Sequence, residues 1–194
     1  MNYLAHLYFA KDNSHSVVGN LMGDFMKGVN IVSLPKATAN GIHTHRMIDK
    51  FTDNHHLVRQ LKPLLSDKRR RFSGLISDVA FDHFLAKHWQ RFHHLSLEQF
   101  CQQVYLHLRN YPHPLPGRMP HVVRSMINDD WLGGYHDMVL TGRAIDSMSK
   151  RIRFKNTLAG AIEEVERHYQ QFEHNFLAFF PELCRHVNQQ NQEQ

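Results

Sequence analysis

The chain has 194 residues, 42% of them hydrophobic and 21% charged, which is enough for one domain with its own core. Its two cysteines, Cys101 and Cys184, cannot form the disulfide framework of a small secreted domain, and neither lies in a zinc or redox spacing. No apolar run approaches the length of a membrane span, and the N-terminal segment lacks the features of a signal peptide. The sequence therefore predicts a cytoplasmic protein that does not span a membrane.

The net charge is +5 with neutral histidines, and the isoelectric point is about 9.3. This balance favours an anionic partner, which could be a nucleic acid, a phosphorylated metabolite or an acidic protein. The 17 histidines are an unusually large number, and histidine is both the commonest metal ligand and the side chain that titrates nearest neutral pH.

Apolar residues recur at helical spacing along nearly the whole chain, and no useful strand alternation or internal repeat occurs. Ser96 and Gln99 form a capping-box pattern, and four prolines between residues 111 and 120 predict a loop. We expect one all-α domain over residues 1–194, in which this loop separates a motif-rich N-terminal part from the C-terminal helices. About eight to ten helices are expected, at about 2–10, 14–28, 37–53, 55–66, 70–92, 96–110, 120–130, 134–150 and from Leu158 to a stop at Pro181.

Two carboxylates lie in the apolar stripe of the helix expected at 70–92. On a helical wheel, Asp78 and Asp82 fall on the same arc as Leu75, Val79 and Leu85. An ionised carboxylate there is costly unless it is paired, hydrogen-bonded or bound to a metal. A buried structural network is the alternative, and it is the stronger interpretation for Asp78.

The helix expected at 37–53 carries His45 and Asp49 on its polar face, four residues apart, so both side chains can reach one cation. A solvated face is the alternative, but such faces usually carry Glu, Lys and Gln. His43 points about 160° away from His45 in a regular helix. Both can bind one metal only if the helix begins near His43.

Asp24 borders another apolar stripe and is surrounded by glycines, among them Gly19 and Gly23. Glycine lowers helix stability by about 1 kcal/mol relative to alanine, so a close approach of another backbone is a good reason to keep it there. His6 occupies a core-like position in the first helix, where a hydrogen-bonded core histidine is the alternative to a functional one. Histidines and aspartates on several helices, with no cysteine among them, suit Mn²⁺, Mg²⁺ or Fe²⁺ and metal-assisted hydrolysis of a phosphate ester.

Five segments together resemble the acyl carrier protein phosphodiesterase family in order and spacing. The match is densest over residues 1–90, patchy from 125 to 155 and mainly a hydrophobic pattern afterwards. The segments are MNYLAHLYFA, GNLMGDFMKG, GIHTHRMIDKFTDNH, DVAFDHFLAKHW and WLGGYHDM.

The resemblance implies a Mn²⁺-dependent hydrolase, with Mg²⁺ or Fe²⁺ as other possible metals, that removes 4′-phosphopantetheine from holo acyl carrier protein. The family is distantly similar to the all-α HD-domain phosphohydrolases, although their dyad is His then Asp whereas here Asp82 precedes His83. Carried over by motif position, the residues expected to bind the metal are Asp24, His45, Asp49, Asp82 and His83. The residues expected to take part in catalysis are His43, Arg46 and His6.

Acyl carrier proteins are strongly acidic, so a basic chain could steer one to its site. The alternative is a merely solvated surface. The arginines expected to contact the carrier protein are Arg69, Arg70, Arg71, Arg151 and Arg153.

Two other functions remain open from the sequence. One is an HD-like phosphohydrolase that acts on a nucleotide through the same metal site. The other is a non-catalytic nucleic-acid-binding or adaptor protein, against which no helix shows a basic stripe with interleaved aromatics. We expect neither a nucleic-acid nor a membrane partner, and the sequence leaves the oligomeric state open.

Overall fold

The computed structural model describes residues 1–190, and within that range all regular structure is helical, which confirms the all-α prediction. Short 3₁₀ turns occur at Gly23–Phe25, Ile31–Ser33, Lys62–Leu64, Arg70–Phe72 and Trp89–Arg91. The α-helices are α1 Tyr3–Tyr8, α2 Ser14–Met22, α3 Lys36–Asn54, α4 His56–Arg59, α5 Ser73–Lys87, α6 Leu97–Arg109, α7 Met119–Asn128, α8 Trp131–Gly134, α9 Met138–Arg151, α10 Ile162–Arg167 and α11 Tyr169–Gln190.

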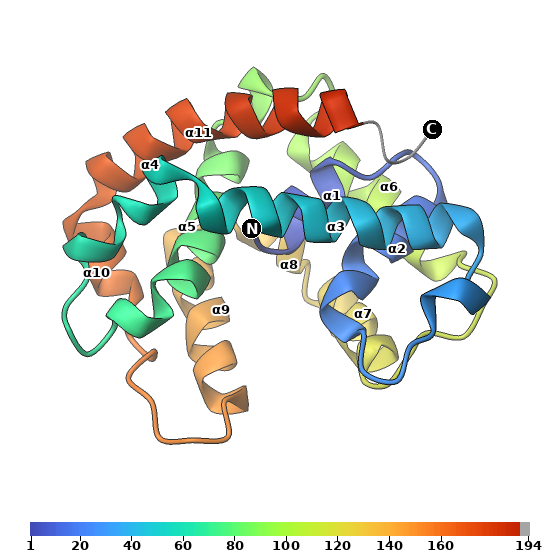
Figure 1. The fold of residues 1–194 in the computed structure, drawn as a ribbon, viewed down its shortest axis with the longest axis horizontal. Helices are drawn as coiled ribbons and strands as arrows, with labels where there is room; N and C mark the ends of the chain where they lie inside the picture. The colour runs from blue at the N-terminus through green and yellow to red at the C-terminus, as the bar shows by residue number, and fades with distance from the viewer. Residues whose placement is uncertain (191–194) are drawn as a thin grey trace.

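Two long helices, α3 and α11, cross the molecule one above the other in Figure 1, with α9 and α7 below them on opposite sides. Helix α2 packs against α3, and α1 packs against both α2 and α5. The N-terminus lies over the C-terminal half of α3 in this view, close to the centre of the fold. The first residues of the chain are therefore buried between helices that come from distant parts of the sequence.

The core between α5 and α11 is aromatic. Phe81 of α5 packs edge-on against Phe176 and tilted against Phe179 of α11, and Phe84 stacks on Phe176; all four side chains are fully buried. Aromatic side chains bury a large apolar area each, so this contact fixes α5, which carries Asp78 and Asp82, against the rest of the fold. No helix within residues 1–190 combines the length and apolar character needed to cross a bilayer.

The capping box is confirmed, because the Gln99 amide donates to the Ser96 hydroxyl and the Gln99 side chain accepts from the Ser96 amide. The expected helices at 14–28, 55–66 and 70–92 are shorter in the structure and end in 3₁₀ turns.

The helix expected from Leu158 to Pro181 has other ends in the structure, and both predicted ends are wrong. Helix α10 begins at Ile162, a break at His168 separates it from α11, and α11 continues through Pro181 to Gln190. A proline inside a helix costs about 3 kcal/mol. Burial of Phe179, Phe180 and Leu183 around it offsets that cost.

Candidate metal centre

The crossing of α2 and α3 depends on two glycines that face each other. A Cβ atom on Gly19 would lie 2.3 Å from the Thr38 carbonyl oxygen, and one on Gly41 would lie 2.8 Å from the Ser16 carbonyl oxygen. These distances are far below van der Waals contact, so only glycine lets the two backbones approach this closely. The prediction of a close approach around Asp24 is confirmed here and at Gly23, where a Cβ would lie 2.2 Å from the His45 ring.

Beside this crossing, His6 of α1 meets His45 and Asp49 of α3 in a group whose potential ligand atoms all lie within 4.8 Å of one another. Asp49 Oδ1 is 3.1 Å from His6 Nε2, and Asp49 Oδ2 is 3.1 Å from His45 Nε2. The two imidazole rings are stacked with centroids 3.7 Å apart. Both histidines are buried, whereas the Asp49 side chain is 41% exposed, so the group opens to solvent on the Asp49 side.

Hydrogen bonding fixes the orientation of the His45 ring. His45 Nδ1 lies 2.8 Å from the Asn20 carbonyl oxygen, and since a carbonyl only accepts, Nδ1 carries the proton. In a neutral ring Nε2 is then an acceptor, yet it faces Asp49 Oδ2 at 3.1 Å and Asp24 Oδ1 at 3.8 Å. Acceptors that face one another need a proton or a cation between them. A histidine that donates its other nitrogen to a backbone carbonyl is the usual arrangement of a metal ligand.

The protonation states also suit a metal. Burial, together with the neighbouring His45, lowers the pKa of His6 to about 3. Burial alone would raise the pKa of Asp49, but the adjacent imidazoles of His45 and His6, together with the Met1 amine, outweigh burial and hold that pKa well below its usual range. At neutral pH His6 is neutral and Asp49 is ionised, which are the forms that bind metal ions. His6 Nδ1 has no hydrogen-bond partner among the described residues.

Asp24 lies at the edge of this group, in the 3₁₀ turn that follows α2, and its side chain is 44% exposed. Burial, opposed by the nearby His45, raises the pKa of Asp24. On the other side, the Met1 amine lies 2.8 Å from Asp78 and 3.5 Å from Asp49. The carboxylates here already hold one positive charge.

Asp82 and His83 do not join this group. Asp82 is fully buried, and its two carboxylate oxygens accept from the backbone amides of Leu4 at 2.7 Å and Ala5 at 3.2 Å. His83 contacts the Tyr135 carbonyl oxygen at 2.9 Å and the Tyr169 hydroxyl at 3.0 Å. Both side chains therefore have structural partners within the fold. For Asp82 this is the buried hydrogen-bond network that the sequence left open as the alternative to metal binding.

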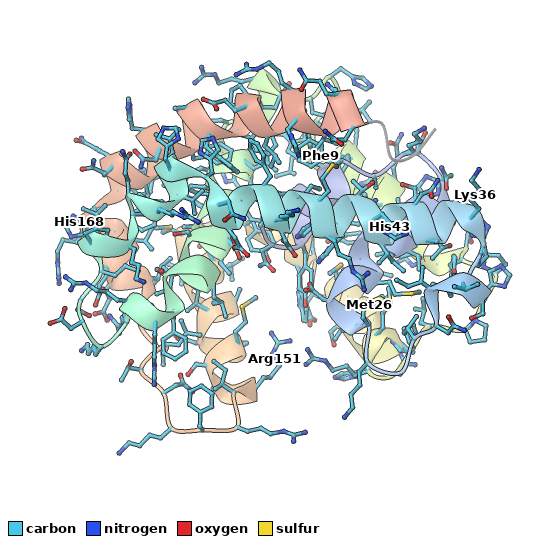
Figure 2. All side chains as sticks on the ribbon, in the orientation of Figure 1. Phe9, Met26, Lys36, His43, Arg151 and His168 are labelled. Carbon is cyan, nitrogen blue, oxygen red and sulfur yellow. The ribbon has the colours of Figure 1, made fainter. Side chains whose placement is uncertain are left out.

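His43 and Arg46 also lie apart from the group. Helix α3 begins at Lys36, well before His43, so the condition under which His43 and His45 could bind one metal is not met. Both His43 and Arg46 are exposed, while His45 is buried. Figure 2 marks His43 midway along α3.

The five arginines expected on a docking surface divide into two kinds. Arg69 is buried, and its guanidinium donates to Glu164 at 2.9 Å and to the carbonyl oxygens of Thr157 and Ala159. These hydrogen bonds link the loop that carries Arg69 to the loop of Thr157 and Ala159. The buried guanidinium therefore contributes little exposed charge. The other four are exposed: Arg70, Arg71, Arg151 and Arg153.

A cleft of about 440 Å³ adjoins the group and is bordered by Asp24, Asp53 and Asp78 together with Arg118 and Arg151. Nothing in the sequence pattern predicted Arg118 here, because this residue lies in the proline-rich segment and belongs to no helical periodicity. Asp78 did carry a signal, since it was a carboxylate in an apolar stripe. Its position facing Asp49 could not be read from one helix.

The chain is similar to known proteins over nearly its whole length. The family model described as acyl carrier protein phosphodiesterase matches residues 1–183. Proteins named acyl carrier protein phosphodiesterase from Serratia proteamaculans and Yersinia pestis are each 35% identical to the chain. Both alignments cover 95% of this chain and 96% of the relative. One from Escherichia coli is 30% identical over 97% of this chain and 98% of its own. No solved structure matches, so the distant likeness to HD-domain enzymes stays a prediction. With a family model covering nearly all of its length and relatives of such identity, the chain belongs to the acyl carrier protein phosphodiesterase family.

Proposed function

We propose that this chain hydrolyses the phosphodiester that links 4′-phosphopantetheine to the serine of holo acyl carrier protein, at a divalent metal ion bound by His6, His45 and Asp49. In this reaction a water oxygen bonds to phosphorus, the bond from phosphorus to the serine oxygen breaks, and that oxygen gains a proton. The products are apo acyl carrier protein and free 4′-phosphopantetheine. The observation that carries the proposal is the buried His6, His45 and Asp49 group in a member of this family.

The donor set favours Mn²⁺, with Mg²⁺ or Fe²⁺ as the alternatives, because it consists of imidazole nitrogens and carboxylate oxygens without a thiolate. A bound ion of this kind activates water and neutralises charge on the phosphoryl oxygens. Asp24 would add a fourth ligand from the 3₁₀ turn, since its carboxylate lies beside His45 Nε2.

Other groups of the chain hold these ligands in place. The Asn20 carbonyl fixes the His45 ring, and Gly23 leaves room for it. Asp82 accepts the first amides of α1 and so fixes the helix that carries His6. A role for the exposed His43 and Arg46 in catalysis stays a prediction.

The partner surface that we propose combines two basic runs that are distant in the sequence. The Arg71 guanidinium lies 5.4 Å from the centre of the Phe154 ring, so the segment of Arg70 and Arg71 adjoins that of Arg153 and Lys155. Phe154 is 58% exposed. An exposed aromatic ring among cations suits an acidic protein, with the charges steering its approach.

The test is incubation of metal-stripped chain with holo acyl carrier protein and Mn²⁺, Mg²⁺ or Fe²⁺, followed by intact mass measurement. We expect loss of the prosthetic group only when a divalent ion is restored. His45→Ala and Asp49→Asn should lower kcat by at least about a hundredfold and weaken Mn²⁺ binding in calorimetry, because both remove ligands.

The matched control is Lys50→Ala, an exposed neighbour of Asp49 on α3, which should keep both properties. Full activity after chelation, or in Asp49→Asn, would show that this group is not the metal site. Hydrolysis of nucleotides with intact holo acyl carrier protein would replace the proposed substrate by the alternative one.

A further inference from the structure

The group of His6, His45 and Asp49, here called the metal group, lies beside a cleft, and a second hollow adjoins that cleft. The cleft, here called the acidic cleft, is bordered by Asp24, Asp53 and Asp78. The second hollow, here called the α9 pocket, lies between α8 and α9 and has a volume of about 340 Å³. Tyr3, Met148 and Arg151 line both of them. The two hollows therefore adjoin each other at these three side chains, and the acidic cleft reaches the metal group at Asp24, whose carboxylate lies 3.8 Å from His45.

The wall of the α9 pocket is one face of α9. Leu140, Ala144, Ser147, Met148 and Arg151 line it, and their spacing of three or four residues places them in a row along the helix. Leu140 is 43% exposed, so an apolar side chain faces the open pocket. This wall offers apolar contact along its length and a few polar groups, the usual character of a small-molecule site.

The rest of the lining of the α9 pocket includes two aromatic rings, beside Asp129 and Asp130. The rings of Tyr3 and Trp131 are stacked with centroids 6.4 Å apart, and both side chains line the pocket. The volume lies within the roughly 300–1,000 Å³ of typical ligand pockets. The pocket thus suits a narrow, partly apolar chain.

Two arginines border the acidic cleft, and one of them also lines the α9 pocket. Arg151 is exposed at the end of α9 and lies at the junction of the two hollows, and Figure 2 labels it beside the gap below α3. Arg118 lines the acidic cleft. Among residues 1–190 neither guanidinium forms an ion pair within 4 Å, although three carboxylates border the same cleft.

The charges of Asp24, Arg151 and Arg118 all affect the pKa of Tyr3. Burial raises the pKa of Tyr3, the charge of Asp24 raises it further, and the charges of Arg151 and Arg118 oppose that rise. All three charged groups thus act on one buried side chain at the junction. Arginines near metal-binding carboxylates and without an acidic partner are suited to a phosphate.

We propose that the α9 pocket holds the pantetheine arm of the substrate and that Arg151, with Arg118, binds its phosphodiester at the junction with the acidic cleft. This inference rests on the proposed function. The arm carries a dimethyl branch, a hydroxyl and two amides in a narrow chain, which matches an apolar wall with a few polar groups. Because the two hollows adjoin at Arg151, an arm that lies along α9 would have its phosphate at the edge of the acidic cleft, on the side of the metal group.

The first test measures binding of free pantetheine to the full-length chain by titration calorimetry. Ser147→Phe places a ring in the pocket at an exposed position, so we expect at least tenfold weaker binding. Val139→Phe adds similar bulk on α9 at a position that is 63% exposed and outside the pocket, so it should bind like the wild type. No pantetheine binding by the wild type, or equal binding by Ser147→Phe, would overturn the proposal.

The second test compares 4′-phosphopantetheine with pantetheine. Arg151→Ala should reduce the preference for 4′-phosphopantetheine over pantetheine by about tenfold, since charge-assisted hydrogen bonds to the phosphate are lost. An unchanged preference would remove Arg151 from the phosphate site. If both compounds bind as expected but holo acyl carrier protein is never cleaved, the proposed function fails while the binding site stands.

Discussion

At the scale of single residues, Asp82 shows that a buried carboxylate has two ways to be tolerated. The sequence placed it in an apolar stripe, where a metal or a hydrogen-bond network could compensate its burial. In the structure both of its oxygens accept amides at the start of α1. Its contribution to the metal group is therefore indirect, through the position of the helix that carries His6.

We expect Asp82→Asn to lower the free energy of unfolding by about 1–3 kcal/mol, because one amide of α1 loses its acceptor, and to leave Mn²⁺ affinity within a few-fold of the wild type. Calorimetry with Mn²⁺ below the melting temperature tests the second part. A folded Asp82→Asn variant without Mn²⁺ affinity would instead make Asp82 a ligand.

The stability difference between the wild type and Asp82→Asn should also depend on pH. Burial raises the pKa of Asp82 to about 7, above its ordinary value of about 3.9. The folded state keeps a proton that the unfolded state has lost, so this contribution to stability is full below about pH 4 and is lost as the pH rises through about 7. Urea unfolding should therefore show the advantage of the wild type over Asp82→Asn shrinking between pH 5 and pH 8.

At the scale of elements, the α2–α3 crossing sets the geometry of the metal group. His45 reaches the Asn20 carbonyl only because Gly19 and Gly41 let the helices approach. Helix propensity argues against glycine at both positions, so the tertiary contact decides them.

Gly41→Ala should lower the free energy of unfolding by about 1–3 kcal/mol, because its Cβ would meet the backbone of α2. It should also weaken Mn²⁺ binding, since α3 carries two of the three proposed ligands. The matched variant is Gly74→Ala at the start of α5, where a Cβ meets nothing within 4 Å. Chemical denaturation should show Gly74→Ala equal to the wild type or up to about 1 kcal/mol more stable. Equal stability of both variants would show that the crossing tolerates a side chain.

At the scale of the whole molecule, the metal group and the basic surface are separate regions. The proposed docking residues lie around Arg71 and Phe154, whereas the metal group lies between α1 and α3. Substitutions in one region should thus leave the chemistry of the other unchanged.

Arg71→Glu and Arg153→Glu together should lower kcat/KM for holo acyl carrier protein at low salt, because surface charges act mainly on the rate of encounter. Raising ionic strength from about 0.05 M to about 0.5 M should reproduce the loss in the wild type, since the Debye length falls from roughly 14 Å to roughly 4 Å. Metal-dependent hydrolysis of bis(p-nitrophenyl) phosphate should be unaffected.

The matched control is Lys36→Glu, an exposed charge at the far end of α3 in Figure 2. If it slows cleavage of the carrier protein as much as the double variant does, only total charge matters. The docking surface would then be abandoned.

The sequence by itself determined the helical class, the capping box at Ser96 and the pairing of His45 with Asp49, because each depends on spacing within one helix. It also indicated that glycines near Asp24 mark a close approach, although not which backbone approaches.

Only the tertiary structure decided which carboxylates and histidines meet. His6 joins the metal group while Asp82 and His83 do not, and Arg69 is buried against Glu164 whereas Arg70 and Arg71 remain exposed. These outcomes depend on contacts between residues distant in the chain. One example is the hydrogen bond from the Leu4 amide to Asp82, which lies 78 positions further along the chain. Helical periodicity gives the face on which a side chain lies, but the partner on that face is set by how the helices pack.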